Sequence, residues 1–357
     1  MEIGKNAIRR LAWIGTIVNS VLLGVSNLCL VVDPEVWSFP QFLGLGFPFL
    51  LSLNIVFIII WLSVLNMRFL LPLLLTISSL FHASKYLQFT AERVSNTDKK
   101  QLKIGSLNTK LFGHWEGREF IDTALFTIRE KDLDIICMQE AYILGKNKDS
   151  ILSNVLINTQ FNDFNYHRLN KDKPFGLILF TKHAILKAIP IELPNTKANM
   201  AMAYDLLINQ DTVRVYNVHL QSIRFTPEDY DFLEGGNSHS KIRKSSNIYH
   251  QMSMAYGNRV KQARVVKSHM NKSPYPNILV GDLNDVPMSY TYQLLLGENR
   301  RDAFREAGKG MESTYIGLIP SLRIDYIMHD KSFYTLNYSS SSEIPSDHKL
   351  VSAELEY

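Results

Sequence analysis

Cysteine is scarce in this chain of 357 residues, which contains only two. Cys29 lies in an apolar run near the N-terminus, and Cys137 lies in a short apolar segment typical of a buried strand. Two isolated cysteines exclude a disulfide framework and leave the redox compartment open. The sequence also lacks internal repeats, and its one low-complexity tract is the serine run 339–342, so no repeat architecture is indicated.

Charged residues are missing from long stretches near the N-terminus. The apolar runs cover residues 11–32, 39–65 and 69–84. Since a helix needs roughly 20 apolar residues to cross a bilayer core, they predict transmembrane helices at about 11–32, 40–65 and 69–87. A cleaved signal peptide is the alternative for the first run, but such a signal has a shorter apolar core, and here two more runs follow. We expect a membrane anchor in residues 1–88, a linker in 89–100 and a separate folded domain in 101–357.

The charges beside these runs bear on membrane orientation. Arg9 and Arg10 precede the first run, Arg68 lies in the second connection, and Asp33 and Glu35 fill the first loop. The positive-inside rule then places the N-terminus in the cytoplasm and the C-terminal domain on the outer, periplasmic face of a bacterial inner membrane. Four cations after the third run favour the opposite orientation: Lys85, Arg93, Lys99 and Lys100.

The remainder of the chain has the pattern of a globular domain. Its strand candidates are residues 102–109, 134–141, 176–182, 202–208, 213–220, 277–284, 323–329 and 350–357, and its helix candidates are 117–133 and 258–270. This alternation indicates an α+β fold in which two sheets pack face to face with helices outside. The net charge of +4 permits a phosphate-bearing substrate without requiring one.

Polar side chains fall at the ends of several apolar strand candidates. They are Asn108, Glu140, His219, Asp282, Asn284 and Asp325, and the pair Asp347–His348 precedes the last strand. Each alone has an ordinary structural explanation, such as a helix cap or an ion pair. Two imidazoles and several carboxylates at separate strand ends are harder to explain in this way. Because strand ends can converge at one edge of a sandwich, they predict a functional site there.

Six motifs in this region carry a specific resemblance. They are "SLNT", "MQEA", "NVHL", "GDLND", "RIDYIM" and "SDHKLV", in the order typical of the endonuclease/exonuclease/phosphatase superfamily, which residues 101–357 resemble. That superfamily includes pancreatic-type deoxyribonucleases, apurinic endonucleases, inositol polyphosphate phosphatases and neutral sphingomyelinases. The resemblance implies a two-sheet α/β sandwich of the deoxyribonuclease-like type and a metal-dependent phosphoesterase. It does not cover the three apolar runs.

The resemblance implies a metal site for Mg²⁺ or Mn²⁺. Glu140 would be the main ligand, since such hard ions prefer carboxylate oxygen. Asn108 would be a neutral oxygen ligand or a group behind the ligands, and Asp347 would contact the metal region. The ion would act as a Lewis acid on the phosphate.

The resemblance also implies roles in hydrolysis. His348 would be the proton acceptor or electrostatic partner of the attacking water, with Asp325 orienting its ring. Asp282 and Asn284 would hold the water or the leaving oxygen, and His219 would hydrogen-bond a phosphoryl oxygen. Which residue is the base stays open.

The substrate is less determined than the reaction. A nuclease is the first expectation, because the segment 223–273 offers cations and aromatic rings that would suit a nucleic-acid backbone: Arg224, Lys241, Arg243, Lys244, Arg259, Lys261 and Arg264, with Tyr230, Phe232, Tyr249 and Tyr256. Of these, Arg224 and Arg259 are the expected substrate-binding residues. A solvated loop and an ordinary surface helix are the alternative explanation. The membrane tether equally suits a phospholipid or phosphoinositide phosphatase, a sphingomyelinase-like phosphodiesterase, or a non-catalytic membrane-anchored binding module.

Overall fold

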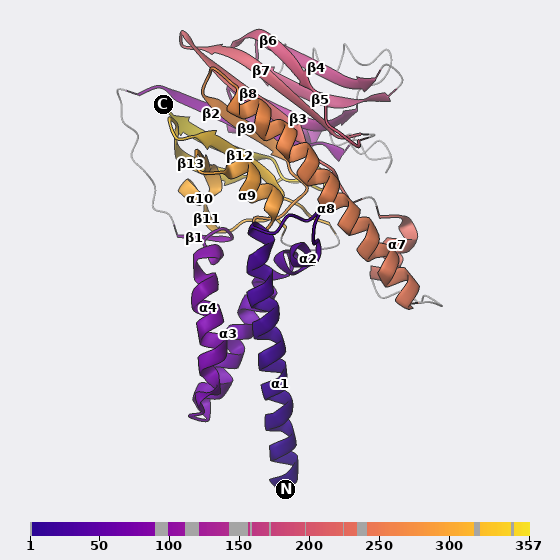
Figure 1. Ribbon diagram of the computed structural model, residues 1–357. Helices are drawn as coiled ribbons and strands as arrows, with labels where there is room; N and C mark the ends of the chain where they lie inside the picture. The colour runs from indigo at the N-terminus through magenta and orange to yellow at the C-terminus, as the bar shows by residue number, and fades with distance from the viewer. Residues whose placement is uncertain are drawn as a thin grey trace.

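A helical stalk built from the N-terminal residues stands against a β-sandwich (Figure 1). The structure is a computed structural model. It describes residues 2–89, 99–110, 121–142, 156–157, 159–170, 173–196, 198–223, 225–233, 241–317, 322–343 and 346–357. Most of the predicted linker, residues 89–100, lies outside these described residues.

The sandwich consists of two mixed six-stranded sheets. The first has the order β13-β14-β2-β3-β5-β4, with strands Tyr334–Ser340, Val351–Glu356, Gln101–Asn108, Ile135–Tyr142, Lys173–Thr181 and Asp163–Asn170. The second has the order β10-β12-β9-β8-β7-β6, with strands Arg300–Asp302, Asp325–Asp330, Asn277–Asp282, Asp211–His219, Met200–Ile208 and Ala184–Ile191. The pairs β2–β3 and β8–β9 are parallel, and the other pairs are antiparallel. The predicted two-sheet sandwich is confirmed.

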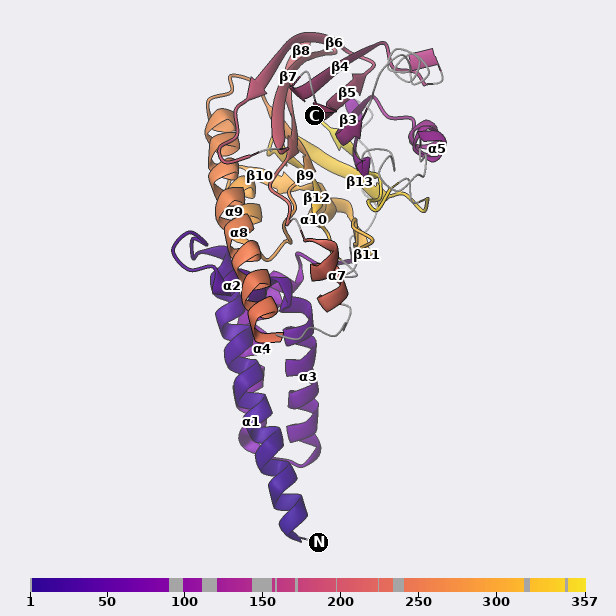
Figure 2. The ribbon, with the colours of Figure 1, turned by 90° about the vertical axis from the view of Figure 1, so that its right-hand side faces the viewer.

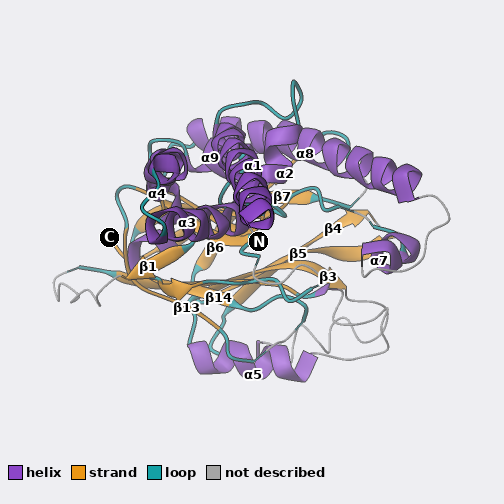
Figure 3. Ribbon diagram, turned by 90° about the horizontal axis from the view of Figure 1, so that it is seen from below, coloured by secondary structure: helices purple, strands orange, loops and turns teal. Residues whose placement is uncertain are grey.

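Helices cover the outer faces of both sheets (Figure 3). Helix α5 (Ile121–Lys131) packs on the first sheet, and α8 (Lys241–Asn271) and α9 (Tyr290–Leu296) pack on the second. Between the sheets lies a continuous apolar core that includes Ile104, Val215 and Val280. Burying each such side chain stabilises the fold by about 1.5–3 kcal/mol, so this core holds the two sheets in a fixed relation.

Every predicted strand overlaps an observed one, but none of the four edge strands of the two sheets was predicted, namely β4, β6, β10 and β13. One side of an edge strand faces solvent, so its sequence is more polar; β6 accordingly has mostly exposed or half-buried residues. Helix α8 begins at Lys241, well before the predicted 258–270. Its first turns and α7 (Pro227–Leu233) project beyond the sandwich beside the stalk (Figures 1 and 2). Two short elements, α10 (Ala303–Ala307) and β11 (Lys309–Met311), complete the domain.

The stalk differs from the three predicted spans. Most of helix α1 (Glu2–Asn27) belongs to Asn6–Leu30, the one unbroken stretch of the described chain that is long and apolar enough to cross a membrane. The helix predicted over about residues 40–65 is broken: α2 (Phe39–Leu45) and α3 (Phe47–Ser63) meet at a 70° bend, and the pair together is apolar and long enough for a broken span or a re-entrant loop. Pro48, in the first turn of α3, cannot donate the backbone hydrogen bond that would continue α2. The third apolar helix, Met67–Ala83 including α4 (Leu70–Ala83), is shorter.

Polar contacts and a small sheet join the stalk to the sandwich. The side-chain oxygen of Gln41 accepts from the backbone N–H of Tyr290 at 3.1 Å, and the buried Arg323 donates to the carbonyl oxygen of Lys85 at 3.0 Å. Strand β1 (Leu87–Phe89) pairs antiparallel with β11. These contacts fix α2 and the end of the stalk against the sandwich.

Candidate active site

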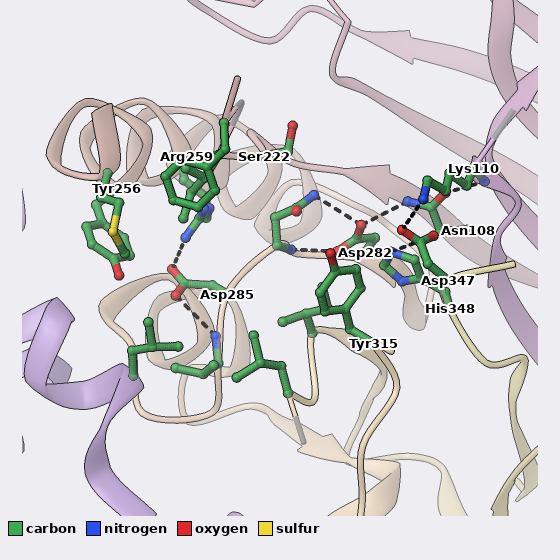
Figure 4. A pocket seen from close by; sticks show the side chains of 18 of the residues that line it. Asn108, Lys110, Ser222, Tyr256, Arg259, Asp282, Asp285, Tyr315, Asp347 and His348 are labelled. Atoms are coloured by element: carbon green, nitrogen blue, oxygen red, sulfur yellow. Dashed lines mark hydrogen bonds and ion pairs between the residues drawn. The ribbon is translucent and has the colours of Figure 1, made fainter. Parts of the chain in front are cut away.

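Six strand ends meet at one edge of the sandwich. The parallel pairs place the carboxyl ends of β2, β3, β8 and β9 there, and β12 and β14 run antiparallel and begin at the same edge. A pocket of about 500 Å³ opens at this edge. Its polar part is lined by Asn108, Lys110, Glu140, Asp282, Asn284, Tyr315, Asp347 and His348. Figure 4 labels six of these residues: Asn108, Lys110, Asp282, Tyr315, Asp347 and His348. The fold therefore brings together polar residues that are far apart in the sequence.

His348 and Asp325 form a buried pair. Nδ1 of His348 lies 2.9 Å from Oδ2 of Asp325, which holds the imidazole ring and leaves Nε2 for the pocket. Ser346 fixes the loop in front of the ring. Its hydroxyl donates to the carbonyl oxygen of Asn108 at 2.6 Å and accepts from the backbone N–H of His348 at 2.9 Å. The "SDH" loop is thus attached to the end of β2.

Glu140 reaches the pocket because β3 is irregular at this point. The register of β3 against β5 shifts between Met138 and Ala141, and Glu140 has a φ of +51°. A bulge re-aims a strand side chain, and a positive φ is uncommon for a residue other than glycine. Such strain is typical of functional positions. Oε1 of Glu140 lies 3.2 Å from Nε2 of His219, at the end of β8.

Asn108 connects the two sheets at the base of the pocket. Its Nδ2 donates to Oδ2 of Asp282 at 3.0 Å and to Oε1 of Glu140 at 3.3 Å. Its Oδ1 accepts from the backbone N–H of Lys110 at 3.0 Å. Asn284 donates its backbone N–H to the other oxygen of Asp282 at 2.7 Å. Both oxygens of the buried Asp282 are therefore held in place by hydrogen bonds.

The clustered charges shift the pKa values of the site. Burial raises the pKa of Asp282 to about 6, and the charge of Asp325 adds to this effect. Burial lowers the pKa of His348, but its attraction to Asp325 outweighs burial and raises the pKa to about 10. Burial raises the pKa of Glu140, but its hydrogen bond with His219 outweighs burial and lowers the pKa to about 2. The site thus concentrates negative charge, which favours a bound cation.

The arrangement of donor atoms fits a divalent cation. Asp282, Asp325 and His348 each offer a ligand atom, and these atoms all lie within 4.8 Å of one another. Oδ1 of Asp325 and Oδ1 of Asp347 are buried and have no hydrogen-bond partner among the described residues. A buried oxygen without a partner is costly, and carboxylate oxygens are the ligands that Mg²⁺ and Mn²⁺ prefer. Glu140 adds a further carboxylate at the same edge.

Of the two arginines expected to bind substrate, only Arg259 lies in the described part of the chain. Arg224 lies outside the described residues. Arg259 lines the pocket, but its Nη1 pairs with Asp285 at 3.0 Å and its Nε donates to the carbonyl oxygen of Gln221 at 2.9 Å. Its Nη2 is buried and has no hydrogen-bond partner within the described part of the chain, so one nitrogen remains for a ligand.

Four polar lining residues were not nominated from the sequence, namely Lys110, Ser222, Asp285 and Tyr315. Nζ of Lys110 lies 3.2 Å from Oδ2 of Asp347, and the ring of Tyr315 packs edge-on against His348 with 5.2 Å between centroids. Lys110 directly follows the "SLNT" motif, and that position was the available signal. Tyr315 belongs to no motif, and backbone pairing with the segment around His348 brings it to the site.

The other part of the pocket is apolar. It is lined by Phe42, Leu45, Ile223, Phe225, Tyr230, Leu233, Met252 and Tyr256. The first two belong to α2, in the region where the sequence predicts a membrane span. The stalk therefore contributes to the wall of the pocket.

Comparison with family models identifies the larger part of the chain. A model described as the endonuclease/exonuclease/phosphatase family matches residues 127–348. A second model, described only as a domain of unknown function, matches residues 9–86. No curated protein matches the chain.

Solved structures share the fold at low sequence identity. A family protein from Bacteroides thetaiotaomicron has a TM-score of 0.53 and 15% identity, over 72% of this chain and 98% of that one. Truncated TDP2 from Caenorhabditis elegans has a TM-score of 0.51 and 14% identity, over 72% and 98%. A mannosyl-6-phosphatase from Bacteroides thetaiotaomicron has a TM-score of 0.50 and 15% identity, over 72% and 100%. Since the family model covers more than half of its length, the chain belongs to the endonuclease/exonuclease/phosphatase family, whose members are hydrolases that act on phosphoester bonds.

Proposed function

We propose that this chain is a membrane-anchored phosphoesterase that hydrolyses phosphodiester bonds with the help of a divalent cation. The observation that carries the proposal is the convergence of the His348–Asp325 and Glu140–His219 pairs on one pocket, from separate strand ends. Two oriented imidazoles beside several carboxylates can move protons and hold a cation, which are the two requirements of metal-assisted phosphoester hydrolysis.

His348 exchanges a proton with the attacking water, and Asp325 holds its ring during that exchange. The water oxygen forms a bond to phosphorus, the ester P–O bond breaks, and the departing oxygen takes up a proton. Asp282 and Asn284 hold the water or the leaving oxygen, and their mutual hydrogen bonds keep them in position. His219, 3.2 Å from Glu140, orients that carboxylate and hydrogen-bonds a phosphoryl oxygen of the substrate.

The proposed ligands of the cation are Glu140 and Asp347; the buried group Asp282, Asp325 and His348 lies at the same edge and adds negative charge to the site. When bound, the ion would act as a Lewis acid on the phosphoryl oxygens and partly neutralise the carboxylates that keep His348 protonated. Asn108 donates its side-chain amide to two carboxylates in this arrangement. It therefore holds these carboxylates in position and does not itself contact the cation.

The stalk suits a bilayer because its polar side chains point inward. Asn19 donates to Oδ1 of Asn54 at 3.2 Å, and Trp61 donates to the buried Thr16 at 2.8 Å. Large apolar side chains are exposed on the outside, as on Val21, which is 56% exposed. Membrane helices associate through such small and polar contacts and leave apolar residues for lipid. We propose that α1, α2–α3 and α4 anchor the chain, with the outer-face orientation that Arg9, Arg10 and Arg68 favour.

The sequence favours nucleic acid as the substrate, but the structure of the folded chain gives that hypothesis less support. Several of the nominated cations form ion pairs within the protein: Lys244 with Asp229, Arg259 with Asp285, Lys261 with Glu35, and Arg264 with Asp33 and Glu35. A cation already paired gains less from a phosphate, because the first pair must be broken. Arg243 is exposed and remains the best support for a nuclease.

The full chain, purified in detergent, tests the proposal. We would measure hydrolysis of 4-nitrophenyl methyl phosphate, 4-nitrophenyl phosphate, single-stranded DNA and RNA with Mg²⁺ or Mn²⁺. Metal-dependent hydrolysis that is strongly reduced in Glu140→Gln at the metal concentration that saturates the wild type, and retained in Glu130→Gln, a change at an exposed position, supports a phosphoesterase. Binding of a phosphate ester without turnover of any substrate would instead identify a non-catalytic binding module.

A further inference from the structure

One wall of the active-site pocket comes from the stalk. Phe42 and Leu45, both on α2, line the pocket together with Ile223, Phe225 and Met252 from the folded domain. A pocket that only had to bind a phosphate group would not require an apolar wall. The wall lies beside the polar end of the same cavity, where Glu140 and His348 are found.

The apolar wall is held in place before any substrate binds. The ring of Phe42 stacks on Tyr249 with 4.7 Å between centroids and packs edge-on against Tyr256 at 5.3 Å. Gln41, the preceding residue, is buried and accepts from the backbone of Tyr290 while donating to the carbonyl oxygen of Cys29 at 2.9 Å. Helix α2 is thus fixed against α8 and the first residue of α9, and the slot it lines is preformed.

The position of α2 also connects the pocket to the membrane side of the molecule. Helix α2 lies where the stalk meets the sandwich, and α7 and the first turns of α8 project beside the stalk (Figures 1 and 2). Tyr230 and Leu233 of α7 line the pocket and are 39% and 40% exposed. Trp37, just before α2, is 45% exposed. Exposed aromatic and apolar side chains at the end of a membrane-spanning bundle are typical of the lipid–water interface.

We infer that the substrate is an amphiphilic phosphodiester, a membrane phospholipid, whose hydrocarbon chain occupies the slot lined by Phe42 and Leu45. Its phosphate then lies at the polar end of the pocket, beside Glu140 and His348. This inference rests on the proposed phosphoesterase function. It explains why a helix of the anchor forms part of the pocket, and why cations near the pocket, such as Arg259 and Lys244, are paired within the protein.

A chain-length series in the wild-type protein tests the inference without any variant. The substrates are 4-nitrophenyl methyl, butyl and octyl phosphate, all hydrolysed by the full chain in one detergent with Mg²⁺ or Mn²⁺. Burial of each methylene should raise kcat/KM about two- to fourfold, so the octyl ester, which is longer by seven methylenes, should exceed the methyl ester by about 10²–10⁴-fold. Equal kcat/KM values across the series would overturn the inference and leave the phosphoesterase proposal intact.

A pair of matched variants then tests whether α2 forms the slot. The double change Phe42→Ser with Leu45→Ser should reduce the ratio of octyl to methyl kcat/KM at least tenfold. The control is Phe39→Ser on the same helix, which changes an exposed ring that stacks on Trp37 and does not line the pocket. Phe39→Ser should keep the wild-type ratio. An unchanged ratio in the double variant would contradict the assignment of the slot to α2.

Natural substrates decide between lipid and nucleic acid. The full chain, reconstituted in vesicles of phosphatidylcholine and phosphatidylglycerol, should release a phosphorylated headgroup or free headgroup that mass spectrometry detects. Single-stranded DNA offered at the same phosphate concentration should be hydrolysed at a lower kcat/KM. Faster cleavage of DNA would overturn the inference. No hydrolysis of any substrate, including the methyl ester, would instead contradict the phosphoesterase proposal itself.

Discussion

The Nδ1 atom of His348 lies 2.9 Å from the Oδ2 atom of Asp325, although the two residues belong to different sheets. Asp325 begins β12 in the second sheet, and His348 precedes β14 in the first. The pair therefore exists only when the sandwich has closed. The same holds for Asn108 and Asp282, which meet across the two sheets at 3.0 Å. Formation of the core and assembly of the site are one event.

Removal of the carboxylate of Asp325 should impair catalysis more than folding. In Asp325→Asn the side chain keeps its size but no longer stabilises the charged form of His348, so kcat should fall about 10²–10⁴-fold. The double variant with His348→Ala should be little worse than His348→Ala alone, because the two residues act as a unit. Steady-state kinetics on 4-nitrophenyl methyl phosphate would check this. Additive losses would show that Asp325 acts independently of His348.

Glu140 should control the affinity for the divalent ion. The change Glu140→Gln removes a negative charge from the proposed ligand set while keeping the volume, and the metal concentration that gives half-maximal activity should rise at least tenfold. Direct titration with Mn²⁺ followed by electron paramagnetic resonance gives the same affinity independently of activity. Glu130→Gln, at an exposed position on α5, is the control and should bind Mn²⁺ as the wild type does. Wild-type Mn²⁺ affinity in Glu140→Gln would exclude Glu140 as a ligand.

Gly281 should tolerate no side chain. Its φ is +143°, and a Cβ atom there would lie 2.0 Å from the carbonyl oxygen of Val218 on β8. Gly281→Ala should therefore reduce the free energy of unfolding by about 3 kcal/mol or more. Gly310 is a matched control, since its φ is +68° but no atom lies within 4 Å of the added Cβ. Gly310→Ala should cost only about 1–2 kcal/mol. Thermal unfolding of both variants compares the two effects, and equal costs would exclude the clash.

Glu306 should make the folded domain sensitive to acid. Burial raises the pKa of this carboxyl, but its hydrogen bonds with His329 and the backbone of Thr335 outweigh burial and lower the pKa to about 2. Because the pKa is depressed on folding, the stabilisation is complete above the ordinary value near 4.5 and is lost as pH falls toward 2. The loss should be about 1–2 kcal/mol, since the carboxyl is partly exposed.

Denaturant titrations at several pH values would check this for Glu306. In Glu306→Gln the free energy of unfolding should depend less steeply on pH between about 4.5 and 2 than in the wild type, whereas Glu130→Gln should follow the wild type. Parallel curves for Glu306→Gln and the wild type would contradict the prediction.

The stalk should stabilise the folded domain. A fragment of residues 101–357 loses β1, the partner of β11, and the carbonyl oxygen of Lys85 that the buried Arg323 requires. An unmet buried donor costs about 1–3 kcal/mol, so the fragment's Tm should be roughly 3–10 °C below that of the full chain in the same detergent. Equal Tm values would show that the two parts are energetically independent.

The sequence by itself determined the buried strands, the order of the polar motifs and the type of chemistry. These features are local: an apolar run of strand length and an acid, amide or imidazole directly after it are visible without any partner. Asn108, Glu140, His219, Asp282 and His348 could therefore be nominated before the fold was known. The edge strands β4, β6, β10 and β13 could not, because their solvent-facing positions weaken the apolar pattern.

Only the tertiary structure decided which residues meet. That Phe42 of α2 packs on Tyr249 and Tyr256, that Arg259 pairs with Asp285, and that Tyr315 lies against His348 are all contacts between segments separated along the chain. No local propensity or periodicity specifies such contacts, because their energy depends on what the closed core places opposite each side chain. For this reason the reaction could be predicted from short motifs, whereas the shape of the pocket that selects the substrate depends on how the stalk packs against the sandwich.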